Sequence, residues 1–377
     1  MILSRRKTIA LIGGGVVTAV GAAAGAFLAT RTPKSALAPW AAAGNYDDPR
    51  LRALSFALLA PSPHNRQPWV GELIGDKGIA VYRDPARNIP KTDPFDRQLI
   101  IGMGCFTELM VQAAAEEGLG VDLTLFPDGE ELDAPVFRAT FTGTATADPL
   151  FAQILHRHTN RNAYDMTRPV PEGDLAKIVE AVTTAVQADA TRKGTEVTQI
   201  RELALEAMIL EIKTPRTHHE SVQLTRIGRA EIEANPDGIS LGGPMMDTLG
   251  LLGILTREAA EDPESRAFET TLQIFRDTFT ATPAFFWIAT HDNRRVDQIA
   301  VGRSWVRVHL AATGLGLAMQ PVSQSLQEYP EMASHRETVH ELLAQPGETI
   351  QMLGRVGYGP PQSPSPRWPL ETRLRAA

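Results

Sequence analysis

The sequence predicts an α+β fold in which sheets are flanked by helices and the chain is organised as two similar halves. Two long amphipathic helices, expected over residues 97–117 and 297–315, each lead into a short strand. Their ends are alike, because AAEEGLGVDL at 114–123 resembles AATGLGLAMQ at 311–320 with one residue of slippage. These observations favour an internal duplication, in which one chain imitates a homodimer.

The N-terminal residues 1–43 are interpreted as an export signal and linker. Ser4-Arg5-Arg6-Lys7 precedes an uncharged, Gly- and Ala-rich run from Thr8 to Thr30, and the paired arginines indicate the twin-arginine type. Small-residue stretches at 36–38 and 41–43 offer cleavage positions. We therefore expect export by the twin-arginine translocase to the periplasm or cell envelope. An uncleaved membrane anchor is the alternative, because the uncharged run is long enough to span a bilayer.

The first half is expected over residues 44–150, after a linker at 31–48. Asp48-Pro49 opens the first helical pattern, and Asp96 is expected to cap the helix at 97–117. The buried stripe of that long helix consists of residues three or four apart: Leu99, Met103, Phe106, Met110 and Ala113. Strands are expected at 79–82, 121–126 and 136–141.

The second half is expected over residues 151–377. Its helices are expected around 173–190, 196–212, 265–279 and 297–315, and its strands at 284–290, 319–323 and 349–356. Residues 235–255, NPDGISLGGPMMDTLGLLGIL, are Gly-rich, Met-rich and apolar without a clear period. Such a segment is typical of a mobile cover over a pocket or of a packed loop.

Composition excludes several classes of function. The 377 residues carry a net charge of −7, whereas a protein that mainly binds nucleic acid usually has a basic face. Cys105 is the single cysteine, so neither an intramolecular disulfide nor a cysteine-rich metal site can form. The pairs His156/His158 and His218/His219 have no further ligand at the spacing of a metal site, so we expect no metal.

Residues 61–69, PSPHNRQPW, form a rigid loop bracketed by prolines. The loop presents two amides, a hydroxyl, a histidine and an arginine. These groups suit the alternating donors and acceptors on the edge of a planar heterocycle, although a polar turn would contain the same residues.

Residues 157–165, RHTNRNAYD, crowd two arginines, a histidine, a threonine and two asparagines into nine positions. A nucleic-acid arm, a metal site, an exposed helix start and a grip on a cofactor phosphate each explain such a cluster. Guanidinium groups suit phosphate because they donate hydrogen bonds in a bidentate fork.

These two stretches resemble the signatures of the FMN-dependent nitroreductase family. The family's flavin-binding loop reads Pro-Ser-Ser-x-Asn-x-Gln-Pro-Trp, and this chain departs from it only at Pro63. The second signature, Arg-x-Ser-x-Arg/Lys followed by an aromatic, is met by Arg157, Thr159, Arg161 and Tyr164, with Thr replacing Ser. The resemblance implies a nitroreductase-like fold with mixed or antiparallel central sheets, and FMN as the cofactor.

The order of the two signatures differs from that of usual nitroreductases, in which the Arg-x-Ser segment comes first and the flavin lies between two subunits. Here the loop comes first, as in the duplicated Acg-like branch, which also carries a late Arg-x-Gly-Tyr-Gly like the one in LGRVGYG at 353–359. Because each half keeps one signature, the resemblance implies one complete FMN site per chain. The protein would be a monomer that acts as a pseudo-dimer.

The resemblance also implies which residues bind FMN: Ser62, His64, Asn65, Gln67, Arg157, Thr159, Arg161, Gly314, Gly316 and Arg367. Arg157 and Thr159 would hold the phosphate and ribityl chain, and Arg161 would lie near the N1/O2 edge of the ring. The two glycines would present backbone amides to the ring, or would simply end a helix. Arg367 keeps the second position of the family's late basic pair, or else is a solvated tail residue.

The implied function is that of an FMN-binding oxidoreductase. Flavin N5 would take hydride from a small-molecule donor and reduce a nitroaromatic or quinone-like acceptor, so no side chain is expected to be catalytic. Residues 235–255 correspond to a lid found in the Acg-like branch. The alternative is a catalytically silent protein that sequesters or senses flavin under a closed lid.

Overall fold

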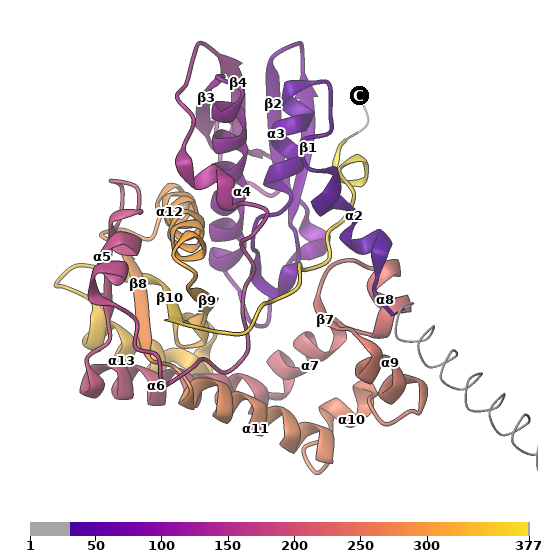
Figure 1. Cartoon of the computed structure of the whole chain (residues 1–377), viewed down its shortest axis with the longest axis vertical. Helices are drawn as coiled ribbons and strands as arrows, with labels where there is room; N and C mark the ends of the chain where they lie inside the picture. The colour runs from indigo at the N-terminus through magenta and orange to yellow at the C-terminus, as the bar shows by residue number, and fades with distance from the viewer. Residues whose placement is uncertain (1–30, 376–377) are drawn as a thin grey trace, which may run out of the picture.

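The computed structural model describes residues 31–375 and contains two four-stranded antiparallel sheets with helices between and around them (Figure 1). The first sheet, in spatial order, consists of β1 (Trp69–Ile74), β2 (Gly78–Arg83), β4 (Pro135–Thr142) and β3 (Gly120–Leu125). The second consists of β5 (Gln187–Thr191), β8 (Ala284–Thr290), β10 (Thr349–Gly357) and β9 (Ala318–Pro321). The expected α+β class with antiparallel sheets is confirmed.

The helices fall into three groups along the chain. Those of the first half are α2 (Lys34–Ala42), α3 (Pro49–Ala57) and α4 (Arg97–Glu116). Those that belong to the second sheet are α5 (Glu172–Glu180), α6 (Gly194–Lys213), α11 (Arg266–Thr280), α12 (Arg295–Gly314) and α13 (Ala333–Leu343). Between α6 and α11 lies a small subdomain of α7 (Pro215–Gln223), β6 (Thr225–Ile227), α8 (Gly228–Ala234), β7 (Ile239–Leu241), α9 (Pro244–Leu251) and α10 (Arg257–Glu261).

The two halves share one topology. In each half two strands of the four-stranded sheet precede a helix of 20 residues, α4 or α12, and the other two strands of that sheet follow it. In each sheet the fourth of these strands lies between the second and the third. Each long helix ends in the same way, with Gly118 at φ 74° and Gly316 at φ 71°, and the next leucine amide bonds back to the helix.

The close crossing of α4 and α12 joins the two halves. Gly104 and Gly302 hold the same position in their helices, and a Cβ on Gly302 would lie 2.8 Å from the Cα of Gly104. A Cβ on Gly104 would collide with the carbonyl of Ile299, and one on Gly302 with that of Ile101. The two contacts mirror each other, so the crossing is close to two-fold symmetric. Only glycine permits backbones to approach so closely.

The main hydrophobic core lies on both sides of this crossing. Phe106 of α4 packs on Trp69 and Phe137 of the first sheet, and Trp305 of α12 packs on Phe286 of the second. Strand β8 is buried at every position, because its other face packs on α6, α11 and α13 in a second core. Within residues 31–375, α4 is the one helix apolar and long enough to cross a membrane, and it is a core helix.

Several expectations need correction. The linker expected at 31–48 contains α2, which buries Ala36 and Trp40. The helix expected over 173–190 ends at Glu180 and is followed by the edge strand β5. Asp96 does not cap α4, because Asp93 accepts the amides of Gln98 and Leu99 at 3.1 and 2.9 Å. Asp96 pairs instead with Arg83.

Other elements were absent from the expectations. Strand β1 and helices α7, α8, α10 and α13 were not indicated by the periodicity. The segment 235–255, expected as a mobile cover or a packed loop, contains the short strand β7 and the helix α9. The twin-arginine motif and the uncharged run lie outside the described residues.

Gly302→Ala tests the crossing. The added methyl group collides with backbone rather than with a flexible side chain, so we expect the free energy of unfolding to fall by about 1–3 kcal/mol despite the better helix propensity of Ala. Denaturant titration measures this change. Gly173→Ala in α5, where nothing lies within 4 Å of the new Cβ, is the matched control. Equal midpoints for the two variants would contradict the argument.

Candidate functional site

Two buried arginines from distant parts of the chain meet at the end of α3. Arg157 donates to the carbonyl of Leu59 at 2.9 Å, and Arg367 donates to the same carbonyl at 3.0 Å. Arg367 also donates to the carbonyls of Leu58 and Ala60, and both arginines are 2% exposed. The two guanidinium groups are therefore neighbours at the negative end of a helix.

This pair has an excess of positive charge. Burial lowers the pKa of Arg157 to about 10, and burial together with the charges of Arg157 and Arg161 lowers the pKa of Arg367 to about 9. Among residues 31–375, no carboxylate forms an ion pair with any of the three arginines. The Nε of Arg157 is buried without a hydrogen-bond partner, so the site lacks an acceptor.

The donors of Arg367 are used differently from those of Arg157. Besides the three backbone carbonyls just after α3, Arg367 donates to Asn65 Oδ1 at 2.7 Å and to the carbonyl of Pro366 at 2.9 Å. All five of its N–H groups are thus engaged within the protein. Because Arg367 lies in this buried cluster, it is not a solvated tail residue. The N–H donor without a partner belongs to Arg157 and not to Arg367.

Residues that the sequence did not single out surround the pair. His309 of α12 lies 3.4 Å from Arg157, and burial holds its pKa well below the usual value, so the ring is neutral. Trp40 of α2 stacks edge-on against His158 and lies 5.5 Å from the guanidinium of Arg367. A tryptophan in a stretch interpreted as linker was the signal that could have identified α2 as part of the site.

Arg161 and His64 are two polar groups of the site that reach the surface. Arg161 is solvent-exposed, yet the protein around its guanidinium group lowers the pKa of that group. A group that is exposed but surrounded by protein in this way is expected in a concave part of the surface. It forms no hydrogen bond or ion pair with the described part of the chain. Burial and the charges of Arg161 and Arg66 lower the pKa of His64 to about 4, so this ring is neutral near pH 7. Its Nε2 lies 3.0 Å from Ser221 Oγ.

The loop 61–69 has a strained backbone. His64, Asn65 and Gln67 have φ values of 46°, 52° and 50°, in a region that side chains other than glycine rarely adopt. The hydroxyl of Ser62 accepts the amide of Gln67 at 2.9 Å, which closes the loop. Such strain persists only where the surroundings enforce it, and it is typical of functional loops.

The amides of Asn65 and Gln67 bind neighbouring segments of the protein. Asn65 donates to Pro366 and accepts from Arg367, while Gln67, fully buried, donates to the carbonyl of Pro236 at 2.7 Å and accepts from the amide of Trp368. Gln67 therefore cross-links the loop to the C-terminal segment and to the start of segment 235–255. It has no exposed surface toward a ligand in this arrangement.

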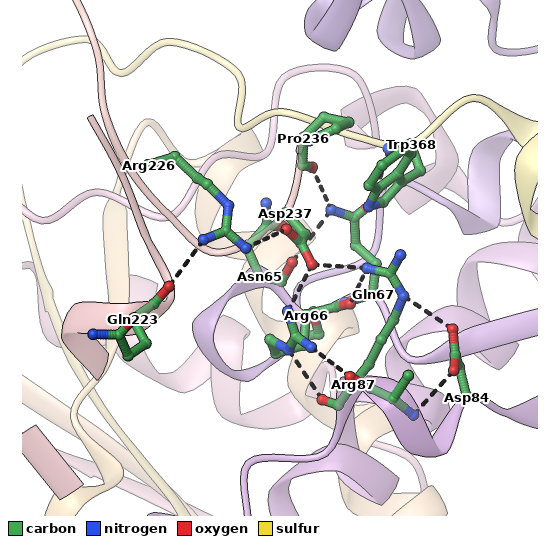
Figure 2. A network of polar contacts seen from close by, with 12 residues as sticks. Asn65, Arg66, Gln67, Asp84, Arg87, Gln223, Arg226, Pro236, Asp237 and Trp368 are labelled. Atoms are coloured by element: carbon green, nitrogen blue, oxygen red, sulfur yellow. Dashed lines mark hydrogen bonds and ion pairs between the residues drawn. The ribbon is translucent and has the colours of Figure 1, made fainter. Parts of the chain in front are cut away.

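A buried ion cluster fastens the segment 235–255 to the same loop (Figure 2). Asp237 accepts from Arg66 at 2.7 Å, from Arg87 at 2.9 Å and from Arg226 at 2.9 Å. Asp237 is 5% exposed, and Arg87 is held in turn by Asp84. Sequence reasoning missed this cluster because its members come from four separate segments.

The segment 157–165 is positioned by β10. Arg355 donates to the carbonyls of Asn160 and Asn162 at 3.2 and 2.6 Å and lies 3.9 Å from the ring centre of Tyr164. Thr159 pairs with Met319 of β9 in an isolated bridge, and its hydroxyl forms no hydrogen bond to another described residue. The segment thus points Arg157 inward and leaves Arg161 accessible.

Gly314 and Gly316 lie apart from the loop 61–69. The nearest side chain to a Cβ on Gly314 is Gln153 at 3.6 Å, and nothing lies within 4 Å of one on Gly316. Gly316 ends α12 in the left-handed conformation, and Leu317 donates to Ala312 at 2.8 Å. Helix termination explains these two glycines as they stand in the structure.

Comparison with known proteins now adds to this geometry. The model of the Nitroreductase family matches residues 154–358, more than half of the chain. This chain belongs to the nitroreductase family. The match includes the segment 157–165 and Arg355, so the family resemblance seen in the sequence is confirmed.

The individual relatives and the solved structure compared with this chain share at most 27% sequence identity with it. The chain is 27% identical over 328 residues to "Putative NAD(P)H nitroreductase Rv3131" of Mycobacterium tuberculosis (strain ATCC 25618 / H37Rv), covering 83% of this chain and 87% of that protein. It is 26% identical over 338 residues to "Putative NAD(P)H nitroreductase acg" of the same strain, covering 85% and 93%. The FMN-dependent nitroreductase NfnB from Mycobacterium smegmatis, solved in complex with NADPH, aligns at 15% identity over 60% of this chain and 96% of its own, with a TM-score of 0.37. That score is too low for the alignment to inform the site.

Arg355→Gln tests how this nitroreductase holds the segment 157–165, its cation segment. Loss of the contacts to Asn160, Asn162 and Tyr164 should lower the free energy of unfolding by about 3 kcal/mol. Hydrogen exchange should become faster at the amides of 157–165. Arg276→Gln, on the exposed side of α11, is the control. Unchanged exchange in 157–165 would show that other contacts hold the segment.

Proposed function

We propose that this chain is an FMN-dependent oxidoreductase with one flavin site built from both halves. The observation that carries the proposal is the pair Arg157 and Arg367, buried without a carboxylate and with one donor unpartnered. A phosphate group supplies both the charge and the acceptor that this cluster lacks.

The residues of this chain divide the work of holding FMN. Arg157 would donate to the phosphate, and Arg367 would support it electrostatically while holding the end of α3 and the loop in place. The hydroxyl of Thr159, two residues from Arg157 in the sequence, has no partner among the described residues and would bind the ribityl chain. Ser62, His64 and Asn65 present the partly exposed edge of the loop, where a planar ring would lie.

Bound FMN would supply hydride transfer through N5, from a small-molecule donor such as a nicotinamide to a nitroaromatic or quinone-like acceptor. The side chains have supporting roles. Arg161 places an unpaired positive charge where it would stabilise negative charge on a reduced ring. His64 is neutral near pH 7, so it would orient a ligand rather than supply a proton from an imidazolium.

We also propose that the chain arose by duplication and works as a monomeric pseudo-dimer, with halves at 44–150 and 151–377. The shared strand order and the two-fold character of the α4–α12 crossing support this proposal. The first half keeps the loop and the second keeps the cation segment, so each half alone lacks a complete site.

Export by the twin-arginine translocase to the periplasm or cell envelope is part of the proposal. Its support is the arginine pair at residues 5 and 6 with the uncharged run behind it. A route that carries folded proteins suits a domain that must take up a non-covalent cofactor first.

A second function, flavin sequestration or sensing under a closed lid, is favoured by the ion cluster at Asp237. Because three arginines hold this residue, the start of the segment 235–255 is fastened to the flavin loop. A lid that stays fastened would keep donors and acceptors out.

Arg157→Ala tests the cofactor assignment. FMN affinity should fall by roughly 1.5–3 kcal/mol because a charge-assisted contact to phosphate is lost. The apoprotein should keep its stability, since Arg367 still satisfies the Leu59 carbonyl and one buried charge is gone. Absorption spectra and chromatography of released flavin measure retention, and Arg276→Ala is the surface control. Parental FMN retention in Arg157→Ala would refute the assignment.

Asp237→Asn separates the two functions. Leaving buried arginines without a carboxylate should cost about 3–5 kcal/mol of stability, against at most about 1 kcal/mol for Asp128→Asn in an exposed pair. If the fastened segment blocks access of the donor to the flavin, NADPH should reduce the flavin of FMN-bound Asp237→Asn faster than that of the parent, seen as loss of flavin absorbance. Equal, rapid bleaching of both would favour the oxidoreductase, and equal inertness would remove the lid as the cause.

A further inference from the structure

The helix α2 lies where a signal would be cleaved, and it is part of the fold. The small-residue stretches 36–38 and 41–43 fall within or directly after α2. The carbonyl of Ala36 accepts the amide of Arg367 at 2.8 Å, and Trp40 donates to the carbonyl of Ser365 at 2.8 Å. Cleavage at either stretch would remove contacts that hold the C-terminal segment against the site. The folded domain therefore includes α2.

The end of α9 exposes a cluster of large apolar side chains. Met245, Leu251, Leu252 and Ile254 are 66%, 74%, 67% and 59% exposed. We call these four residues the α9 patch. Single exposed apolar residues are common, but four within ten positions of one short helix and its last turn indicate a surface that is covered in use.

The uncharged run of the sequence joins the described structure beside this patch. Arg31, the first described residue, lies 3.6 Å from Asp247 of α9. Arg31 also lines a cavity of about 600 Å³ together with Gly250 and Leu251. Residues 8–30 are uncharged and long enough to span a bilayer, and the basic residues 5–7 before them favour the cytoplasmic side. A retained segment of this kind brings the face that carries Arg31 to the membrane.

We propose that residues 8–30 remain as a membrane anchor and that the α9 patch rests in the interface of the same bilayer. Lipid is the occupant that the position of the patch selects, because the chain that would enter the membrane starts from the same face. Leucine, isoleucine and methionine side chains on one short helix and the turn after it suit shallow burial among acyl chains. The anchor alone would leave the domain free to tumble, whereas the patch fixes which face meets the lipid.

The inference goes beyond the proposed flavin chemistry and does not depend on it. Segment 235–255 would then have two attachments: Asp237 to the flavin loop at its start and the α9 patch to lipid at its end (Figures 1 and 2). The site and the membrane would be linked through one short segment of chain.

Depth-dependent fluorescence quenching on the full-length protein tests the proposal. Cys105 is buried, so an introduced cysteine is the accessible labelling position. Leu252→Cys, labelled with an environment-sensitive fluorophore, is reconstituted in phosphatidylethanolamine–phosphatidylglycerol vesicles that contain lipids spin-labelled near the headgroup. Leu132→Cys is the matched control, 47% exposed in the connection between β3 and β4.

We expect several-fold stronger quenching at position 252 than at position 132, and an intact N-terminus by mass spectrometry of protein extracted from cell envelopes. Equal quenching at the two positions would overturn the docking of the patch. A blue-shifted label at 252 without lipid quenching would also overturn it, since protein rather than lipid would then cover the patch. A mature chain that begins after Ala38 or Ala43 would overturn the anchor.

Discussion

The close contact between α4 and α12 is the constraint on which the rest of the molecule depends. Because Gly104 and Gly302 lack side chains, the two helices meet backbone to backbone, and the two sheets pack on one continuous core. Two segments then connect the halves. Residues 157–165 lie against β9 and β10, and Arg157 donates to the carbonyl of Leu59 in the first half. The C-terminal segment returns to β1, where the amide of Arg375 donates to the carbonyl of Gly71. The site lies where these segments pass the end of α3, so it exists only when both halves are docked.

At that place the protein tolerates an unfavourable electrostatic arrangement. Arg157 and Arg367 are buried, repel each other and have only carbonyls and a neutral histidine as partners. Burying an unpaired charge is costly, whereas the arginines of the other cluster, Arg66, Arg87 and Arg226, are paired with Asp237. The contrast between the two clusters supports different roles: one fastens segments of the protein together, and the other is arranged for an anion from outside.

The loop 61–69 lies between these two clusters. Its left-handed residues each carry a conformational cost of order 1–3 kcal/mol, which contacts to Arg367, Pro236 and Trp368 must offset. A change at Asp237 would therefore reach the loop through Arg66 and Gln67. This coupling relates the state of segment 235–255 to the shape of the proposed flavin site, and it is where an enzyme and a closed flavin-binding protein would differ.

Sequence periodicity was sufficient for the long elements, such as α4, α12 and β8, because each is buried along a regular face. It failed for α2, α13 and the subdomain of α7–α10, whose short helices owe their stability to contacts distant in the chain. The prediction that Asp96 caps α4 was also wrong, because the backbone at Asp96 is left-handed and its carboxylate pairs with Arg83.

By itself the sequence determined the family, the α+β class and the two segments proposed to form the flavin site, because motifs and apolar periods are local properties of the chain. Only the tertiary structure decided that Arg157 has an unpartnered donor while Arg367 has none, that Gln67 is a cross-link, and that Asp237 fastens the segment above the loop. These contacts join residues that are far apart in the chain and come together only when the two helices pack. A local sequence pattern therefore cannot predict them.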